Sequence, residues 1–259
     1  MVSIISVPYH LDEHLPDLVA PLLPDADAIE LAVELPREEV WPRLGRLYDA
    51  VADAVEQSVR AGSLPIVVSG DCTVSIGMTT GLQRAGVEPS IVWFDAHGDL
   101  QSLETTSSGY LGGMALRVLI GYRPELVSRG LGLRAPADDR VLLVGARDLD
   151  PAEVDYLATS GVRQSTIDEL SADSLPAGPL LVNLDLDVVD PEHLPGLRYP
   201  APDGPDVPSV LAAMRTVVET GRVAALNIAC TWRPGGSDPD GVRDHLVSDV
   251  LSNVWEHAG

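Results

Sequence analysis

The sequence predicts an α/β protein in which a mostly parallel sheet is covered by helices on both faces. Short runs of β-branched and aliphatic residues alternate with longer amphipathic stretches along the 259-residue chain. Strands of a parallel sheet are buried on both faces, so they occur as continuous apolar runs. No repeat of fixed period and no low-complexity tract interrupts this alternation, and we therefore expect a single domain over residues 1–259.

Six apolar runs are expected to form strands. The first, VSIISVP, lies at the N-terminus, where proline and acidic residues follow too soon for a signal peptide. The others, in order, are LPIVVSG, PSIVWFDAHGD, DRVLLVGARD, GPLLVNLDLDVVD and RVAALNIACTW. Helical spacing extends over Arg37 to Ala61 and over Val207 to Thr220, and HLVSDVLSNVWEHAG predicts a last helix. The second run passes through a glycine turn, SGDCTVSIG, into another helix.

Two stretches rich in proline and glycine, Glu192 to Pro208 and Arg233 to Gly241, follow predicted strands. Loops after the strands of an α/β sheet commonly carry binding and catalytic residues. We therefore expect both stretches to be active-site loops rather than domain boundaries.

The composition excludes several classes of function. The formal net charge is −22, so we expect neither nucleic acid nor a membrane as a partner. All 17 basic residues are arginine, which removes Schiff-base, pyridoxal-phosphate and P-loop chemistry. Two cysteines are too few for a disulfide scaffold. The apolar runs are too short to span a bilayer, and the expected location is the cytoplasm.

Acidic side chains recur at alternate positions where two predicted strands end. Asp95, His97 and Asp99 in FDAHGD would share one face of an extended chain, and Asp185 and Asp187 repeat the spacing. So dense a cluster of carboxylates requires a cation, and oxygen ligands with one imidazole suit Mn²⁺ or a similar ion. Enough carboxylates are present to bridge two ions, an arrangement that activates a shared water as hydroxide.

Each of these acids also has a simpler interpretation. A lone aspartate after a strand more often caps a turn or a helix. Two alternating sets at apolar strand ends favour a functional cluster, because gathered like charges need a stabilising partner. Asp190 follows the second set, directly before Pro191.

Three motifs resemble the metal-binding motifs of the ureohydrolases, the arginase and agmatinase family. SGDCTVSIG, DAHGD and NLDLDVVDP stand in the order of that family's GGDHS, DAHxD and SFDxDxxDP. The resemblance covers most of the chain. It implies a three-layer αβα arginase-like fold with about eight strands, two Mn²⁺ ions per chain and hydrolysis of a guanidino C–N bond.

The resemblance also implies a ligand set. The six ligands would be Cys72, Asp95, His97, Asp99, Asp185 and Asp187. Asp95 and Asp185 would bridge the two ions. Cys72 and Asp99 would complete one ion, the remaining two ligands would complete the other, and Asp71 would support the site from outside the ligand set.

The substrate contacts implied by the resemblance belong to an α-amino acid. Gln101 and Ser108 would bind its carboxylate, and Asp150 and Glu153 would bind its amino group. Agmatine and guanidinobutyrate each lack one of these groups, so a small amino-acid substrate is favoured. Asp150 and Glu153 have an equally good interpretation as the start of a helix with proline at its first position. Tyr110 replaces a family asparagine and either lines the pocket or packs as an ordinary aromatic residue.

Three departures from the family pattern concern the reacting end of the substrate. Cys72 stands where a metal-binding histidine is usual, and Gly112 stands where the family's proton-shuttling histidine is usual. Cys230 replaces the glutamate that holds the guanidinium. Either the chain is an inactive relative, or it acts on a substrate that needs neither of those groups. The surviving carboxylates and amino-acid contacts favour the second interpretation.

A hydroxyguanidine substrate would explain the absence of the family's histidine and glutamate. Its N-hydroxyl lowers the basicity of the guanidine and supplies its own hydrogen-bond donor and acceptor. The same changes resemble the branch of the family that acts on Nω-hydroxy-L-arginine in D-cycloserine biosynthesis. We therefore expect attack of a metal-bridging hydroxide on Nω-hydroxy-L-arginine, giving hydroxyurea and L-ornithine. The alternatives are arginase or another guanidino-acid ureohydrolase, and a non-catalytic relative that binds metal or an amino acid.

Two further expectations are less closely tied to the motifs. His10 and His14 stand four residues apart in a segment rich in proline and acids, and they are expected at the surface. The chain has no evident extension after its last helix to cover a subunit interface, so a monomer is favoured over the trimer usual in arginases.

Overall fold

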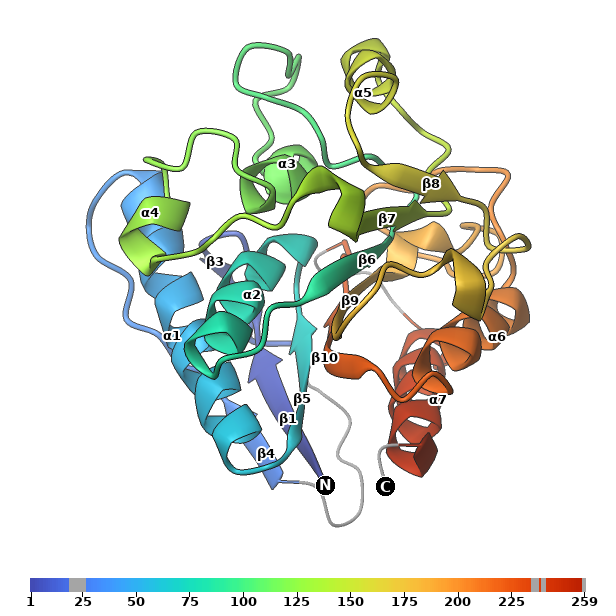
Figure 1. Cartoon of the computed structure of the whole chain (residues 1–259), viewed down its shortest axis with the longest axis horizontal. Coiled ribbons are helices and arrows are strands. Elements are labelled where there is room, and N and C mark those ends of the chain that lie inside the picture. Colours follow the sequence, from blue (N-terminus) through green and yellow to red (C-terminus); the bar gives the residue numbers. More distant parts are fainter. Residues whose placement is uncertain (19–26, 234–237, 239–240, 258–259) are drawn as a thin grey trace.

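The computed structural model describes residues 1–18, 27–233, 238 and 241–257, and its centre is a parallel sheet (Figure 1). The strands of this sheet are β1 (Val2–Val7), β4 (Asp27–Glu30), β5 (Leu64–Ser69), β6 (Ser90–Phe94), β7 (Val141–Val144), β8 (Arg163–Ser165), β9 (Leu180–Asp185) and β10 (Val223–Ala229). Their spatial order is β4-β1-β5-β10-β9-β6-β7-β8, and every pairing is parallel. A small antiparallel hairpin, β2 (Tyr9–His10) and β3 (Glu13–His14), follows β1.

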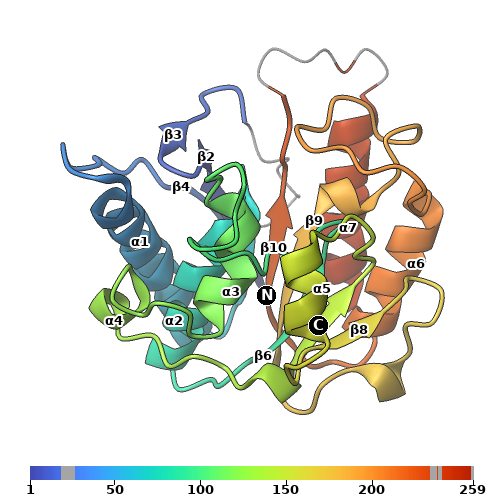
Figure 2. The same cartoon turned by 90° about the horizontal axis from the view of Figure 1, so that it is seen from above.

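Helices cover both faces of the sheet (Figure 2). They are α1 (Val40–Arg60), α2 (Ser75–Arg84), α3 (Ala115–Leu119), α4 (Ser128–Leu131), α5 (Pro151–Leu157), α6 (Val207–Val218) and α7 (Val242–His257). One face packs against α1 to α4, and the other packs against α6 and α7. The three-layer α/β arrangement expected from the sequence is confirmed.

The core consists of two hydrophobic clusters, one on each face of the sheet. Successive residues of a strand point to opposite faces, so Ile5 and Val67 join the first cluster while Ile4 and Ile66 join the second. The long helix α1 completes the first cluster with a buried stripe at helical spacing, namely Leu44, Leu47, Tyr48, Val51 and Val55. Burial of the strands on both faces explains their continuous apolar sequences.

All six predicted strands are present, and two more lie at or near the sheet's edges. β4 (DAIE) and β8 (RQS) are short and polar, and each pairs with only one neighbour. Edge strands of this kind protect a sheet from pairing with other chains, and they lack the apolar run that identifies a central strand. β4 and β8 could therefore not be predicted as strands from their sequences.

The expected helices lie within a few residues of their predicted bounds. Of the two predicted active-site loops, the first lies entirely within the described residues. The loop after β9 includes Tyr199 and reaches the carboxyl edge of the sheet. The second predicted loop, Arg233 to Gly241, falls mostly outside the described residues.

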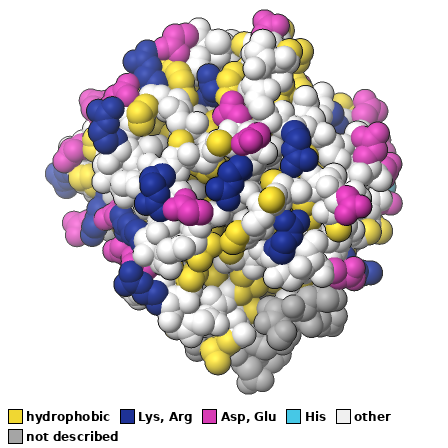
Figure 3. Space-filling view, viewed as in Figure 1, with side chains coloured by type: hydrophobic (Ala, Val, Ile, Leu, Met, Phe, Trp, Pro, Cys, Tyr) yellow, Lys and Arg dark blue, Asp and Glu magenta, His cyan; other side chains and the backbone are white. Residues whose placement is uncertain are grey.

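Arginine and acidic side chains are interspersed on the face of the molecule shown in Figure 3. Several arginines of the described chain are held in ion pairs, as with Arg84, whose guanidinium lies 2.7 Å from Asp49 and 2.8 Å from Asp53. Within the part of the chain that the structure describes, no helix combines the length and apolar character needed to cross a membrane.

Candidate active site

A cavity of about 210 Å³ lies at the carboxyl edge of the sheet. Parallel strands bring their carboxyl ends to one edge, which is where α/β folds place their ligands. The cavity is lined by all of the predicted site residues except Cys230. Residues from the ends of β5, β6 and β9 therefore meet in one place, although they are far apart in the sequence.

The turn after β5 is fixed by close packing against the N-terminal hairpin. A Cβ atom on Gly70 would collide with the carbonyl oxygen of Tyr9, so only glycine fits there. The buried Asp71 carboxylate accepts hydrogen bonds from the backbone N–H of Thr73 at 2.8 Å and from the N–H of Leu11. These contacts place Cys72 at the start of the short 3₁₀ turn that leads into α2.

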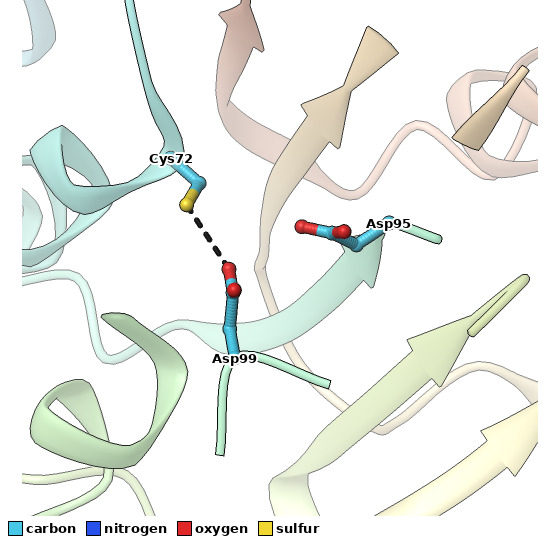
Figure 4. A group of neighbouring side chains, drawn as sticks. All are labelled: Cys72, Asp95 and Asp99. Carbon is cyan, nitrogen blue, oxygen red and sulfur yellow. Dashed lines mark hydrogen bonds between the residues drawn. The ribbon is translucent and has the colours of Figure 1, made fainter. Parts of the chain in front are cut away.

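Cys72, Asp95 and Asp99 form the first group of candidate metal ligands (Figure 4). Their ligand atoms lie within 4.8 Å of one another, and all three residues are buried. The Cys72 thiol donates a hydrogen bond to Asp99 Oδ2 over 3.0 Å. Asp99 adopts a φ of 53°, a conformation that aspartate tolerates better than most residues. This left-handed backbone turns its carboxylate toward the thiol.

Asp95 also belongs to a second group, together with His97 and Asp187, with ligand atoms again within 4.8 Å of one another. His97 Nδ1 lies 3.2 Å from Asp95 Oδ1 and 3.2 Å from Asp187 Oδ2. Asp185 lines the same cavity but lies outside both groups; it accepts hydrogen bonds from the Thr231 hydroxyl and the Asp187 N–H. The two adjacent ligand groups share Asp95, one of the two residues implied as bridges, whereas Asp185, the other implied bridge, belongs to neither group.

The buried acids of this cluster destabilise one another. Burial raises the pKa values of Asp99 and Asp185, and the charges of neighbouring carboxylates raise them further. Burial, followed by the charge of Asp95, raises the pKa of Asp187 to about 7. Burial lowers the pKa of His97, but hydrogen bonds to Asp187 and Asp95 outweigh it and raise that pKa to about 12.

The donor set fits a divalent cation. Carboxylates with an imidazole suit Mn²⁺ and similar ions, and a thiolate adds a softer ligand. A cation would neutralise the repulsion that raises the pKa values of the acids, and it would displace the protons that Cys72 and His97 hold. The residues present are therefore compatible with two metal ions.

The cavity also carries polar groups that are held in fixed orientations by hydrogen bonds. The Gln101 amide donates to Asp150 Oδ2 over 2.6 Å, and its oxygen accepts a hydrogen bond from Thr105 at 2.7 Å. Ser108 lines the cavity nearby, and its Oγ accepts a hydrogen bond from the N–H of Tyr110 at 3.2 Å. An acidic group and an amide thus stand together where the resemblance implies the amino-acid end of a substrate.

Glu153 has a structural role at the start of α5. It is buried, and its two oxygens accept the backbone N–H groups of Leu100 at 2.9 Å and Asp150 at 3.0 Å. A Cβ atom on Gly98 would lie 2.6 Å from Glu153 Oε1, so the loop after β6 packs directly on this carboxylate. Of the two interpretations of Glu153, the geometry favours the helix start, where Oε2 accepts the N–H of Asp150. Oε1 accepts the N–H of Leu100 and so links α5 to the loop after β6 that carries the candidate metal ligands.

Replacement of Glu153 by glutamine is expected to destabilise the protein by about 2 kcal/mol, because the new amide N–H₂ cannot accept one of the two backbone N–H groups. Denaturant unfolding measures this loss. Asp155→Asn on the same helix is the matched control, since that side chain is exposed, and it should change stability by less than about 0.5 kcal/mol. Equal stability of the two variants would contradict the structural role of Glu153.

The sequence of the chain is similar to that of known proteins. A protein-family model described as the arginase family matches residues 11–232, which is most of the chain. The chain belongs to the arginase family. It is an arginase-family ureohydrolase with a candidate metal site, and members of the family are dinuclear metal enzymes.

Individual arginase-family relatives agree with this assignment. The chain is 30% identical over 221 residues to an N(omega)-hydroxy-L-arginine amidinohydrolase of Streptomyces lavendulae, covering 84% of this chain and 78% of that protein. It is 30% identical over 191 residues to an arginase of Bacillus subtilis, covering 68% of this chain and 64% of the relative. The aligned part therefore spans slightly less than two thirds of that arginase.

Solved structures of the arginase family share the fold. A crystal structure of arginase from Bacillus subtilis superposes with a TM-score of 0.79 at 24% identity, covering 98% of both chains. The arginase of Entamoeba histolytica in complex with L-ornithine gives a TM-score of 0.81 at 18% identity, again covering 98% of both chains. The three-layer arginase-like fold is thereby established.

Cys230 is the predicted site residue that the arginase-family fold does not bring into the cavity. Its buried side chain belongs to the hydrophobic cluster on the side of α6 and α7, and the next residue, Thr231, lines the cavity instead. Burial, followed by the charge of Asp185, raises the pKa of the Cys230 thiol. Successive side chains at a strand end point to opposite faces, and a strand buried on both faces gives no pattern that separates them.

Sequence reasoning missed five residues that line the cavity, namely Thr106, Gly113, Asp148, Tyr199 and Thr231, and it misplaced His10. Thr231 orients Asp185, and Tyr199 contributes a ring from the loop after β9. The prediction that His10 is a surface residue is wrong, because its side chain is buried in the β2 hairpin against the turn at Gly70. His14 is exposed, as expected. The apolar run of the first strand leads through Pro8 directly to Tyr9 and His10, and this continuity is the signal that could have identified His10 as buried.

Proposed function

We propose that the protein is a manganese-dependent amidinohydrolase that converts Nω-hydroxy-L-arginine and water to hydroxyurea and L-ornithine. One observation carries the proposal: a single cavity joins the carboxylate cluster to the Gln101 and Asp150 pair. A substrate that spans it would place an amino-acid group at one end and a carbon to be hydrolysed at the other. The similarity to the Streptomyces lavendulae amidinohydrolase supports the choice of substrate.

The two ligand groups would hold the metal ions. Cys72, Asp95 and Asp99 would bind one ion, and Asp95, His97 and Asp187 would bind the other. When bound, the metal pair would supply the activated water and the positive charge needed for hydrolysis at neutral pH. In the overall reaction, water oxygen bonds to the guanidino carbon, the bond from that carbon to Nδ breaks, and Nδ leaves with a proton as the amine of ornithine.

The chain's own groups orient the substrate. Asp150 provides the negative charge that an α-ammonium group requires, and the hydrogen bonds of Gln101 to Thr105 and Asp150 fix its amide in one orientation. Ser108 adds a hydroxyl that can donate to the α-carboxylate. These fixed groups would position the amino-acid end before the reaction begins.

The part of the cavity that would face the reacting group of the substrate favours a guanidine of low basicity. Thr231 presents a neutral hydroxyl to the cavity next to Asp185, while the Cys230 thiol lies on the other side of the strand. A guanidinium has a pKa above about 12, and it is held best by a carboxylate. An N-hydroxyguanidine is less basic and therefore depends less on such a partner.

A side-by-side assay tests the proposal. The Mn²⁺-loaded protein is expected to release ornithine from Nω-hydroxy-L-arginine at least tenfold more efficiently, in kcat/KM, than from L-arginine, a difference of about 1.4 kcal/mol. Agmatine, which lacks the carboxylate, should not be turned over. Comparable efficiency with L-arginine would contradict the substrate assignment, and turnover of no guanidine would indicate a relative that only binds metal or an amino acid.

A further inference from the structure

The space beside Gly112 is filled by another side chain. A Cβ atom on Gly112 would collide with Tyr110, at the ring carbons Cε1 and Cζ and at the hydroxyl oxygen. The backbone of Gly112 does not adopt a positive φ, so space, rather than conformation, requires glycine here. The end of the Tyr110 ring therefore occupies the volume into which any side chain at position 112 would extend.

The Tyr110 ring is held between two other aromatic rings. His10 stacks on it with a centroid distance of 5.8 Å and an interplanar angle of 12°, and Tyr199 lies 4.7 Å away at 38°. The three rings come from the β2 hairpin, the loop after β6 and the loop after β9. The ring cannot move away from position 112 without disturbing these contacts.

The hydrogen bonds of His10 fix the orientation of the Tyr110 hydroxyl. His10 Nδ1 lies 3.2 Å from the carbonyl oxygen of Gly70, which can only accept, so Nδ1 carries a hydrogen. In the neutral ring, Nε2 is then an acceptor, and it lies 3.3 Å from the Tyr110 oxygen. The Tyr110 hydroxyl therefore donates to His10, and its oxygen, which also has the Tyr199 side chain as a hydrogen-bond partner, can still accept through a remaining lone pair.

Tyr110 stands at the metal end of the cavity. It lines the cavity wall together with Asp71 and Cys72. Burial, followed by the charges of Asp71 and Cys72, raises the pKa of the phenol, so the hydroxyl stays protonated. A neutral acceptor thus lies beside the first ligand group.

We propose that Tyr110, positioned by His10, replaces the missing side chain at position 112 and accepts a hydrogen bond from the N-hydroxyl group of a hydroxyguanidine substrate. This inference rests on the proposed function and adds the residue that distinguishes the hydroxylated substrate. A single acceptor aimed at an added O–H group favours the substrate that has it, whereas plain arginine leaves the same oxygen without that partner. His10 acts through Tyr110 and is a positioning residue.

Substrate discrimination tests the acceptor. Tyr110→Phe is expected to lower kcat/KM for Nω-hydroxy-L-arginine about tenfold and kcat/KM for L-arginine less than about twofold. His10→Phe keeps the stacked ring but removes the acceptor at Nε2, so it should cause the same selective loss, and His10→Gln, which retains an acceptor, should restore most of it. The double variant should lose no more than Tyr110→Phe alone. Equal losses for both substrates would overturn the proposal.

Melting temperatures test the packing without reference to activity. Gly112→Ala is expected to lower the melting temperature by about 4 °C or more. Gly113→Ala is the matched control, because its Cβ would meet only Gln101 Cγ, at 3.9 Å. In a Tyr110→Ala background, the Gly112→Ala change should have no further effect, since the ring that it would strike is gone.

The two measurements separate the possible failures. If the unmodified protein hydrolyses no guanidine, the proposed function fails, while the melting temperatures still report whether Tyr110 fills the space beside Gly112. If Gly112→Ala and Gly113→Ala melt alike, or if Gly112→Ala remains destabilising without the Tyr110 ring, the inference about Tyr110 fails even in an active enzyme.

Discussion

Replacing Asp95 with asparagine is expected to lower turnover on the order of 10³-fold and to remove both metal ions together. The two candidate ligand groups in the described part of the chain share Asp95. Asparagine keeps the shape of the side chain, but it carries no charge and offers one weaker ligand oxygen. Elemental analysis of the purified variant measures the metal content, and a steady-state assay at saturating Mn²⁺ measures the rate.

The same substitution is expected to stabilise the metal-free protein. The pKa values of Asp99, Asp185 and Asp187 are raised by burial and by neighbouring carboxylates. An acid with a raised pKa binds protons more tightly when folded, so stability falls as the pH rises through the window from 3.8 to about 7 given by Asp187. Asp95→Asn removes a charge that repels these three acids, while His97 keeps Asp187 as a charged partner at 3.2 Å. Its melting temperature in chelator should therefore exceed that of the unmodified protein, most clearly near pH 7.

Asp190→Asn is the matched control for this prediction. Asp190 belongs to the acidic motif NLDLDVVDP, which also contains Asp185 and Asp187, but its carboxylate accepts the backbone N–H groups of Glu192 and Gly204, each at 2.8 Å. Its replacement should keep both metal ions and cost about 1–2 kcal/mol of folding stability. An Asp95→Asn protein that retained two ions per chain and its full rate would overturn the ligand assignment.

Replacing Cys72 with serine is expected to weaken Mn²⁺ binding by about 10- to 100-fold, because a neutral hydroxyl replaces a thiolate ligand. Cys72→His, which supplies the ligand usual in the family, should retain tight binding. Titration of the metal-free proteins with Mn²⁺, followed by calorimetry, measures both affinities. Unchanged metal content and rate in Cys72→Ser would show that Cys72 is not a ligand.

The pH dependence of binding identifies the thiol more specifically. Burial raises the pKa of Cys72 well above its ordinary value, and the charge of Asp99 raises it further, so the thiol is protonated at neutral pH. Metal binding must displace this proton, and affinity should therefore rise with pH by up to about tenfold per unit. The hydroxyl of Cys72→Ser keeps its proton whether or not metal is bound, so that variant should lack this part of the slope.

The central strands could be predicted from the sequence because burial on both faces leaves a readable signal. Each apolar run, such as VSIISVP or LPIVVSG, corresponds to a strand with neighbours on both sides. The edge strands β4 and β8 could not be predicted in this way, since a strand with one neighbour and an exposed side needs no apolar run.

The candidate ligands could be predicted because they lie in short motifs with alternate spacing. Asp95, His97 and Asp99 lie within five residues directly after β6, so the sequence alone brings them near one another, although the left-handed backbone at Asp99 departs from the extended chain that the spacing implied. Tyr199 reaches the cavity through a long loop, and His10 reaches Tyr110 through the hairpin after β1. No local pattern fixes such an approach. Cys230 and Thr231 show the limit within a strand, where the sequence locates the strand end but not which of two neighbouring side chains faces the site.

The position of β10 has a consequence for the order in which the protein is assembled. β10 is the last strand along the chain, yet it lies in the middle of the sheet, between β5 and β9. During synthesis, β6 and β9 can pair as soon as residue 185 has emerged, but no strand pairing joins β5 to them until β10 is made. We therefore expect Cys72, at the end of β5, to reach its final place beside Asp95 and Asp99 only after β10 has inserted, which would make the complete ligand set one of the last features to form.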